Sequence, residues 1–395
     1  FKDHFKNSKI YKKNLIKTKK ICDFLISDVK KNKIPLLNSY SKDYKFSFSK
    51  KTIKKFSKEK NIIVFGMGGS ALGAESIYSF FKTKIKKKVF FFDNLDPNLN
   101  YKYKEIKNLK NSFFILISKS GNTLETIVNF GIVFSKNTQK KNLIVITEST
   151  NSTLTAIANK YKAELIEHKN FIGGRYSVLS ETGMFLAALM GLNLSKFKNL
   201  KKLIKNKNFV SSLIQNVACI YSLNKRKISN SILLNYDTSL NDFGLWYQQL
   251  VAESLGKKGS GIYPILSSGP KDHHSLLQLY LDGPKDKFFT FINSSKKEKN
   301  LKFNSKIIPQ NYRFLKNKNI EFFINAQCKA AKNIFKIKKI HFREITFKNR
   351  NEEELGKFFT FFVLETILLS RLMNVNPFNQ PAVELVKTET KKILG

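Results

Sequence analysis

Short apolar runs alternate with helix-length segments from about residue 60 to residue 350. The runs are NIIVF (61–65), KVFFFD (88–93), SFFILIS (112–118) and NLIVIT (142–147) in the first half of this region, and SILLNY (231–236), KFFTFI (287–292) and IHFREITF (340–347) in the second half. Continuous apolar strands separated by helical segments are typical of parallel sheets buried on both faces. The pattern therefore predicts an α/β protein with two doubly wound parallel-sheet domains.

Helical patterns flank and separate these strand regions. The first 50 residues predict a lysine-rich covering arm with apolar side chains at helical spacing, namely Leu15, Ile16, Ile21, Phe24 and Leu25. A helical stretch is expected from about 178 to 223, and two long helices, at 352–373 and 381–394, are expected to close the chain. The expected parts are an N-terminal helical arm (1–50), a first α/β domain (51–190), a second α/β domain (191–350) and C-terminal helices (351–395).

The formal net charge of +42 first suggests a nucleic-acid-binding protein. The 395 residues include 71 Lys+Arg against 29 Asp+Glu, but only six of the basic residues are arginine, and the lysines are scattered through the whole chain. A nucleic-acid-binding face concentrates its basic residues and uses arginine for bidentate contacts. Lysine, asparagine, isoleucine and phenylalanine all have A/T-rich codons, so we attribute the charge to genomic drift and expect no specific nucleic-acid partner.

Cysteine spacing and hydropathy indicate the compartment. Cys22, Cys219 and Cys328 lie far apart, which argues against a disulfide framework or a zinc knuckle. The longest apolar stretch, 358–369, is shorter than the roughly 20 residues that a membrane span requires, and the first residues lack the apolar core of a signal peptide. We therefore expect a soluble, cytoplasmic protein with no membrane partner.

A glycine-rich loop, GMGGSALG (66–73), joins the first predicted strand to a helix. Gly66, Gly68 and Ala71 satisfy the G-x-G-x-x-A pattern, and Asp93 ends the next strand, so a dinucleotide site is one interpretation. The motif alone is weak, because glycines at a strand-to-helix turn also serve tight packing.

A second loop, SKSGNTLET (118–126), follows the third predicted strand. Ser118, Ser120 and Thr123 offer hydroxyl groups, Gly121 lets the backbone turn, and the amides that open the next helix favour an anion. The arrangement fits a phosphomonoester better than a pyrophosphate. Such Ser/Thr runs are also common helix N-caps, but two loops of this kind on neighbouring strand ends favour a ligand crevice at that edge of the sheet.

Two later segments supply a cation and a carboxylate. In NFIGGRYSVLS (170–180), Arg175 follows two glycines, where its guanidinium can reach developing negative charge. In FGLWYQQLVAESLGKK (243–258), Gln249 and Glu253 lie four residues apart on one helix face, and a carboxylate among apolar neighbours can serve as a general base. In isolation, such a pair is more often a solvated helix face.

Two further segments, KDHHSLLQ and FNQPAVELVK, complete the candidate residues. His273 and His274 would point in different directions on a helix, so at most one serves a given site, and without a third ligand pattern no zinc site is expected. Gln380 precedes a helix that starts with proline, and Lys387 lies two turns into that helix. Taken alone, Lys387 is one more surface lysine.

Together and in this order, these segments resemble the phosphoglucose isomerases, a family built from two sugar-isomerase (SIS) α/β domains. The likeness extends over most of the chain from about residue 60 to 390. The motifs that carry it are the GxGGS loop at 66–70, the phosphate loop at 118–126, the GGR turn at 173–175, the Q-x-x-x-E helix at 249–253, the histidine loop at His274 and the C-terminal Q-x-x-V-E-x-x-K at 380–387.

The resemblance implies an aldose–ketose isomerase that interconverts D-glucose 6-phosphate and D-fructose 6-phosphate through a cis-enediol, without a metal or redox cofactor. It implies that Glu253 moves a proton between C1 and C2 while Arg175 stabilises the enediolate, and that His274 and Lys387 assist ring opening. Substrate binding is assigned by the same resemblance to Gly69, Ser70, Ser118, Lys119, Ser120, Thr123, Glu125, Gly174, Gln249 and Gln380. Because the family's histidine comes from the partner subunit, a homodimer with a shared active site is also implied.

The sequence departs from the family pattern at a few positions, and alternatives stay open. Asn379 stands where the family usually has Asp, Ala382 where it usually has Gly, and Ser120 where many members have Thr. The ISKSGNT loop leans toward bifunctional phosphoglucose/phosphomannose isomerases, so an enzyme that also accepts mannose 6-phosphate stays an alternative. A non-catalytic sugar-phosphate-binding protein would not need Arg175 and Glu253, and an NAD-dependent dehydrogenase would explain neither the second loop nor the Q-x-x-x-E helix.

Overall fold

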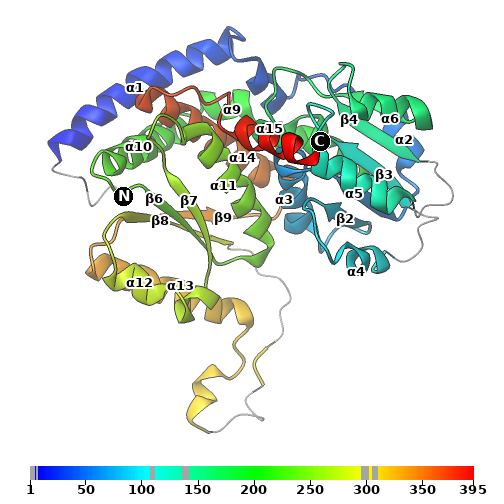
Figure 1. The fold of residues 1–395 in the computed structure, drawn as a ribbon. Coiled ribbons are helices and arrows are strands. Elements are labelled where there is room, and N and C mark those ends of the chain that lie inside the picture. Colours follow the sequence, from blue (N-terminus) through cyan, green and yellow to red (C-terminus); the bar gives the residue numbers. More distant parts are fainter. Residues whose placement is uncertain (1–4, 6–7, 107–111, 136–141, 295–301, 305–309) are drawn as a thin grey trace.

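The computed structural model describes Phe5 and residues 8–106, 112–135, 142–294, 302–304 and 310–395. Figure 1 shows two parallel sheets side by side, each with helices on both of its faces. The expected α/β architecture with two doubly wound parallel-sheet domains is confirmed.

The first sheet has five strands in the order β2-β1-β3-β4-β5, and all neighbouring strands are parallel. These strands are β1 (Asn61–Phe65), β2 (Lys88–Phe92), β3 (Ser112–Ile117), β4 (Leu143–Thr147) and β5 (Glu164–Glu167). The helices of this half are α2 (Lys50–Phe56), α3 (Leu72–Phe81), α4 (Leu99–Lys104), α5 (Leu124–Ser135), α6 (Thr153–Tyr161) and α7 (Glu181–Leu189). Every residue of the three central strands is buried, which explains their continuous apolar sequences.

The second sheet has four parallel strands in the order β7-β6-β8-β9. They are β6 (Asn230–Asn235), β7 (Tyr263–Ser268), β8 (Lys287–Ser294) and β9 (Phe342–Phe347). The helices of this half are α8 (Leu194–Phe197), α9 (Leu200–Lys205), α10 (Lys207–Asn224), α11 (Asn241–Leu255), α12 (Leu277–Asp282) and α13 (Ile320–Ile337). In both sheets the chain reverses its winding beside the first strand, which creates a crevice at the carboxyl ends of the strands.

The sequence pattern missed two strands and joined several helices into one. The missed strands, β5 and β7, lie at the edges of their sheets, where the apolar run is short and, in β7, contains Pro264. The single helical stretch expected at 178–223 is instead four helices, α7 to α10. Gly191 adopts a positive φ of 81° after α7, and Asn193 and Asn206 cap the helices that follow, so the chain turns where a continuous helix was expected.

The N-terminal arm forms α1 (Lys9–Lys30), which packs against α10 and against the long helix α14 (Glu352–Met373). Two of the apolar positions expected to face the core, Ile16 and Phe24, are 73% and 58% exposed. The buried face instead includes Asn14, whose amide donates to a serine of α10. Leu15, Ile21 and Leu25 do pack against the core, so the buried face contains three of the five apolar positions together with polar side chains that have partners there.

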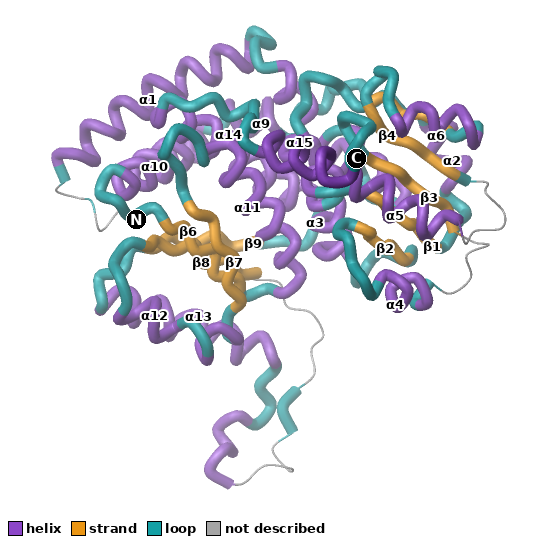
Figure 2. The backbone as a smooth tube through the Cα atoms, viewed as in Figure 1, coloured by secondary structure: helices purple, strands orange, loops and turns teal. Residues whose placement is uncertain are grey.

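The two C-terminal helices differ sharply in burial. Helix α14 matches the predicted range 352–373 and is buried along most of its length. By contrast, α15 (Val383–Leu394) has no buried residue and lies across the surface of the molecule, where Figure 2 shows it close to the first sheet. Helix α3 from the first half packs against α11 from the second. The contact between these two helices places the carboxyl edge of the first sheet beside α11.

Candidate active site

The glycine loop after β1 packs against the rest of the site through its backbone. Gly68 has a positive φ of 52°, and a Cβ there would lie 2.8 Å from Nε2 of Gln249. A Cβ at Gly69 would lie 2.1 Å from the carbonyl carbon of Gly174. Both positions therefore require glycine. Ser70 ends the short 3₁₀ turn that these residues form, and it is partly exposed.

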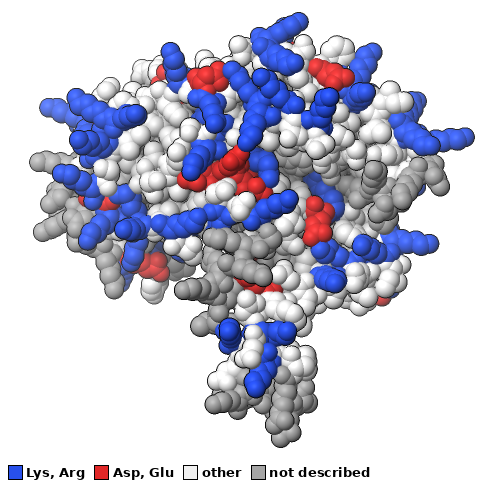
Figure 3. Space-filling model, turned by 180° about the vertical axis from the view of Figure 1, so that it is seen from behind, with Lys and Arg blue, Asp and Glu red and all other residues white. Residues whose placement is uncertain are grey.

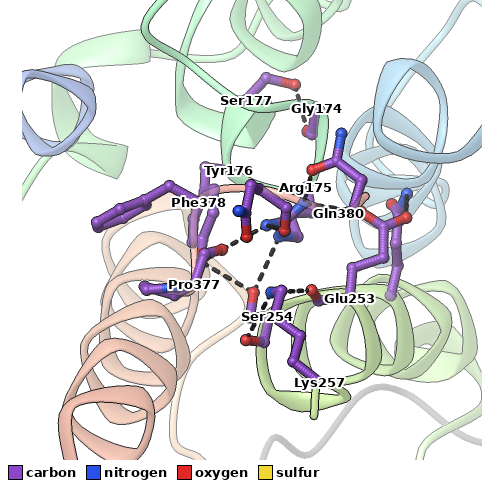
Figure 4. Close-up of polar contacts among 12 residues, drawn as sticks. Gly174, Arg175, Tyr176, Ser177, Glu253, Ser254, Lys257, Pro377, Phe378 and Gln380 are labelled. Atoms are coloured by element: carbon purple, nitrogen blue, oxygen red, sulfur yellow. Dashed lines mark hydrogen bonds and ion pairs between the residues drawn. The ribbon is translucent and has the colours of Figure 1, made fainter. Parts of the chain in front are cut away.

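Arg175 is the centre of the polar cluster shown in Figure 4. Its side chain is only 1% exposed. The guanidinium donates from Nη1 to Oε2 of Glu253 at 2.9 Å and to Oε1 of Gln380 at 2.8 Å. From Nε it donates to Oγ of Ser254 at 2.9 Å, and from Nη2 to the carbonyls of residues 377 and 379. The GGR turn, α11 and the segment before α15 therefore meet at one arginine.

The Glu253 carboxylate is held on both oxygens. Gln249, one turn earlier on α11, donates from Nε2 to Oε1 at 2.9 Å, while Arg175 occupies Oε2. The sequence indicated apolar surroundings for this carboxylate, and the structure corrects that expectation: Leu250 and Val251 are buried in the core, whereas the carboxylate faces polar groups and is 28% exposed. Helical spacing placed Gln249 and Glu253 correctly on one face.

Two residues next to Glu253 belong to this cluster and were missed by sequence reasoning. Lys257 donates from Nζ to the backbone carbonyls of Glu253 at 2.6 Å and Ser254 at 2.9 Å. Its partial burial and the nearby Arg175 lower the pKa of Lys257 to about 8. Ser254 is fully buried and also bonds the hydroxyl of Tyr176 at 2.8 Å. The i,i+4 spacing of Lys257 from Glu253 is the signal that could have identified it.

The loop after β3 brings three hydroxyl groups together. Oγ of Ser118 lies 2.7 Å from Oγ1 of Thr123 and 3.5 Å from Oγ of Ser120. Gly121 has a φ of 68° and donates its backbone N–H to Ser118 Oγ at 3.2 Å. Helix α5 begins immediately afterwards, at Leu124, so its free amides and positive dipole end face the same region. The structure thus brings these three hydroxyls together at the start of α5.

Lys119, in the same loop, is directed elsewhere. Its Nζ donates to the carbonyl of Asn170 at 2.7 Å and lies 3.5 Å from Oε1 of Glu148. Lys119 is absent from the lining of the cavity next to the hydroxyls. Its assignment to the sugar pocket stays a prediction.

Helix α15 lies against this loop across a cavity of about 350 Å³. Ser120, Thr123 and Glu125 line one side of the cavity, and Lys387 and Lys391 line the other. Two predicted site segments, more than 250 residues apart in the sequence, are thereby brought together. The fold could do this only by returning the C-terminus to the first sheet.

The histidine loop does not join this cluster within a single chain. His274 is exposed on the 3₁₀ turn that follows β7, at the other sheet, and no hydrogen bond links it to Arg175 or Glu253 in the part of the chain that the structure describes. His273, in contrast, is half-buried and lies 2.6 Å from the hydroxyl of Tyr236 through its Nε2. Burial and the neighbouring His274 lower the pKa of His273. His274 is the more exposed of the two histidines.

Figure 3 shows Lys and Arg distributed over the face it displays, with acidic residues among them. Among the described residues, no group of three or more His, Cys, Asp or Glu side chains is placed to hold a metal ion. None of the described helices combines the length and apolar character needed to cross a membrane.

Comparisons with known proteins agree with this geometry. Residues 47–395 match the phosphoglucose isomerase family. A glucose-6-phosphate isomerase from Methanocaldococcus jannaschii is 31% identical, with 95% of this chain and 96% of the relative aligned. One from Campylobacter jejuni is 30% identical over 85% of this chain and 86% of its own.

Solved structures show the same fold at lower identity. A hypothetical protein from Thermus thermophilus superposes with a TM-score of 0.83 at 19% identity, covering 98% of this chain and 96% of that one. A glucose-6-phosphate isomerase from Chlamydia trachomatis has a TM-score of 0.74 at 17% identity, covering 87% and 72%. The family match over most of the chain and the 31% identity to the relative from Methanocaldococcus jannaschii show that this chain belongs to the phosphoglucose isomerase family.

Proposed function

We propose that this protein is an aldose–ketose isomerase that interconverts D-glucose 6-phosphate and D-fructose 6-phosphate. The observation that carries the proposal is the contact between a nearly inaccessible Arg175 and a partly exposed Glu253, 2.9 Å apart. Aldose–ketose isomerisation needs a base that removes a carbon-bound proton and a fixed cation where the oxyanion develops. These two residues supply both.

Glu253 acts as the base that carries a proton between C1 and C2 of the open-chain sugar. Gln249 holds one carboxylate oxygen, which fixes the orientation of the group. Substrate entering the site competes for the other oxygen, which Arg175 occupies in the free enzyme. Arg175 then donates to the enediolate oxygen, and its remaining bonds to Ser254 and to backbone carbonyls keep it in place during the reaction.

The phosphate group is bound at the other end of the cleft, by the hydroxyls of Ser118, Ser120 and Thr123. These groups do not take part in the proton transfer. Their binding energy orients the reacting carbons against Glu253. Gly69 and Gly174 allow the backbone to approach the sugar closely, and Ser70, Lys119, Glu125 and Gln380 complete the proposed contacts.

We also propose that the active form is a cytoplasmic homodimer. His274 is exposed and separated from the Arg175 cluster within one chain, although ring opening requires an acid–base group at the sugar ring. A second copy of the chain would supply it. Lys387, which lines the cavity beside the hydroxyl loop, assists the same step.

Replacing Glu253 by Gln tests the proposed function. Purified protein is mixed with fructose 6-phosphate, and glucose 6-phosphate is followed through a coupled dehydrogenase. Removing the general base should lower kcat by roughly 10² to 10⁴-fold while leaving the thermal unfolding temperature within a few degrees. The matched control is Glu389→Gln, an exposed acid in the middle of α15, which should keep wild-type turnover.

Two results would overturn the assignment: no turnover by the wild type, or equal turnover by wild type and Glu253→Gln. Mannose 6-phosphate is assayed in parallel with the same proteins. Turnover of both substrates, lost together in Glu253→Gln, would identify a bifunctional phosphoglucose/phosphomannose isomerase.

A further inference from the structure

The cavity between α15 and the hydroxyl loop contains a lysine that the family motifs do not include. The loop side presents Ser120, Thr123 and Glu125, and the helix side presents Lys387 and Lys391. The two lysines are four residues apart, so they project from the same face of α15. This cavity is where the proposed function puts the sugar phosphate, and the inference below rests on that function.

The direction of α15 separates the roles of the two lysines. Gln380, just before the helix, bonds Arg175 at 2.8 Å, so the start of α15 lies at the proton-transfer end of the cleft. The helix then passes Lys387 and, one turn or about 6 Å further along its axis, reaches Lys391. Of the two, Lys391 is therefore the lysine farther along the helix from Arg175, toward the end of the substrate that carries the phosphate.

The other lysines of this region already have partners. Lys119, in the hydroxyl loop itself, donates to the carbonyl of Asn170. Lys387 is paired with Glu384 at 2.8 Å. Among the described residues, Lys391 takes part in no ion pair. Its charge is thus available to a ligand without breaking a contact.

The charges that line the cavity indicate that Lys391 is needed for the binding of an anion. Glu125 and Glu384 are balanced by Lys387 and Lys391, so without Lys391 the lining would carry a net negative charge. The hydroxyls and the amide groups at the start of α5 supply hydrogen bonds but no full positive charge. A charge-assisted hydrogen bond stabilises a bound phosphate dianion more than a neutral hydrogen bond does. A lysine ammonium provides the point charge for such a bond.

We propose that Lys391 binds the phosphate group of the substrate, across the cavity from Ser120 and Thr123. It acts in substrate binding and not in proton transfer, so its loss should affect KM and leave kcat largely intact. Because α15 has no buried residue, a substitution at Lys391 should leave the fold unchanged.

The test compares Lys391→Met with Lys392→Met. Lys392 is the adjacent lysine, but it pairs with Glu389 at 3.1 Å and is absent from the cavity lining. Inorganic phosphate is the probe, and its dissociation constant is measured by calorimetry without any turnover. Lys391→Met should weaken phosphate binding by about tenfold and raise KM for fructose 6-phosphate similarly, with kcat within twofold. Lys391→Arg should recover part of the affinity.

Each outcome bears on a different statement. Equal phosphate binding by wild type and Lys391→Met would overturn the role of Lys391. An equal loss of phosphate affinity in Lys391→Met and Lys392→Met would also overturn it, because the effect would then come from a general loss of positive charge. A wild type that fails to bind phosphate at millimolar concentration would also overturn it. Phosphate binding that depends on Lys391 in a protein without isomerase activity would support the site and refute the proposed function.

Discussion

Arg175 is one of only six arginines in a chain that otherwise uses lysine for positive charge. It makes five hydrogen bonds in different directions, to the side chains of Glu253, Ser254 and Gln380 and to two backbone carbonyls. A planar guanidinium with five donors can satisfy this arrangement, whereas a lysine ammonium has three donors at a single point. The geometry of the site therefore suits arginine and not the lysine that the rest of the chain mostly uses.

Gly69 gives a residue-scale prediction about the glycine loop. An added methyl group would lie 2.1 Å from the backbone of Gly174, so Gly69→Ala must push apart the loop and the GGR turn that carries Arg175. We expect the free energy of unfolding to fall by roughly 1–3 kcal/mol and kcat/KM to fall at least tenfold. Urea denaturation and the coupled isomerase assay measure the two effects.

Gly131→Ala is the matched control for that change. Gly131 lies inside α5 with nothing within 4 Å of the position its Cβ would take, so alanine should stabilise the helix by about 0.5–1 kcal/mol. Activity should stay at the wild-type level. Equal stability for Gly69→Ala and the wild type would show that the loop can yield without cost, contrary to the packing described here.

At the scale of elements, α3 connects the glycine loop to the interface with α11. Its first turn contains Glu75, which is buried. Burial raises the pKa of Glu75 to about 8, and the nearby Asp93 and Asp242 act in the same direction, while Lys102 opposes them. The helix therefore carries a carboxyl group that is protonated in the folded protein at neutral pH.

This carboxyl group makes stability depend on pH. Between about pH 4.5 and 8, folded Glu75 keeps a proton that the unfolded chain has released, so the free energy of unfolding decreases as the pH rises through this window. Glu75→Gln cannot ionise and should flatten the decrease. We expect the variant to match the wild type near pH 4.5 and to exceed it by on the order of 1–3 kcal/mol at pH 8.

Denaturation curves at several pH values measure this difference. Glu105→Gln, a substitution of an exposed acid at the end of α4, is the control and should follow the wild-type profile. An advantage of Glu75→Gln that stays constant from pH 4.5 to 8 would contradict the titration of Glu75 as its cause.

At the scale of the whole molecule, one chain gathers most of the candidate site but leaves His274 on the other sheet, away from Arg175. A homodimer that shares its active sites would complete each site with a histidine from the other subunit. Helix α15 also exposes apolar side chains, including Leu385 and Val386 at 73% and 71%. On the face that Figure 3 displays, basic side chains are spread over the surface. Their distribution does not single out one region of that face for a charged partner.

Mixing two inactive variants tests the shared site. Glu253→Gln and His274→Ala should each have little activity as homodimers. After subunit exchange, every mixed dimer holds one site with both defects and one intact site, so activity should return to about a quarter of the wild-type value. Light scattering should report twice the 45.6 kDa chain mass. A failure to recover activity after confirmed exchange would show that each site draws both residues from one chain.

The sequence alone was enough to locate the central buried strands and to identify the motifs of the candidate site. Buried parallel strands such as β1, β3 and β4 are apolar along most of their length, and helical spacing fixes Gln249 and Glu253 on one face whatever the surroundings. The edge strands β5 and β7 lacked this signal because an edge has fewer buried neighbours. For α1, hydrophobicity correctly indicated Leu15, Ile21 and Leu25, which pack against the core, but not Asn14, which is buried with a partner inside the interface.

Only the tertiary structure decided which of the motif residues meet. The bond between Arg175 and Gln380 joins segments 205 residues apart, and local spacing contains no information about such a contact. The same holds for Lys257 and Lys391, which look like ordinary surface lysines in a chain with 65 of them. Their surroundings distinguish them: the end of α11 places Lys257 beside Arg175, and the return of α15 to the first sheet places Lys391 opposite the hydroxyl loop.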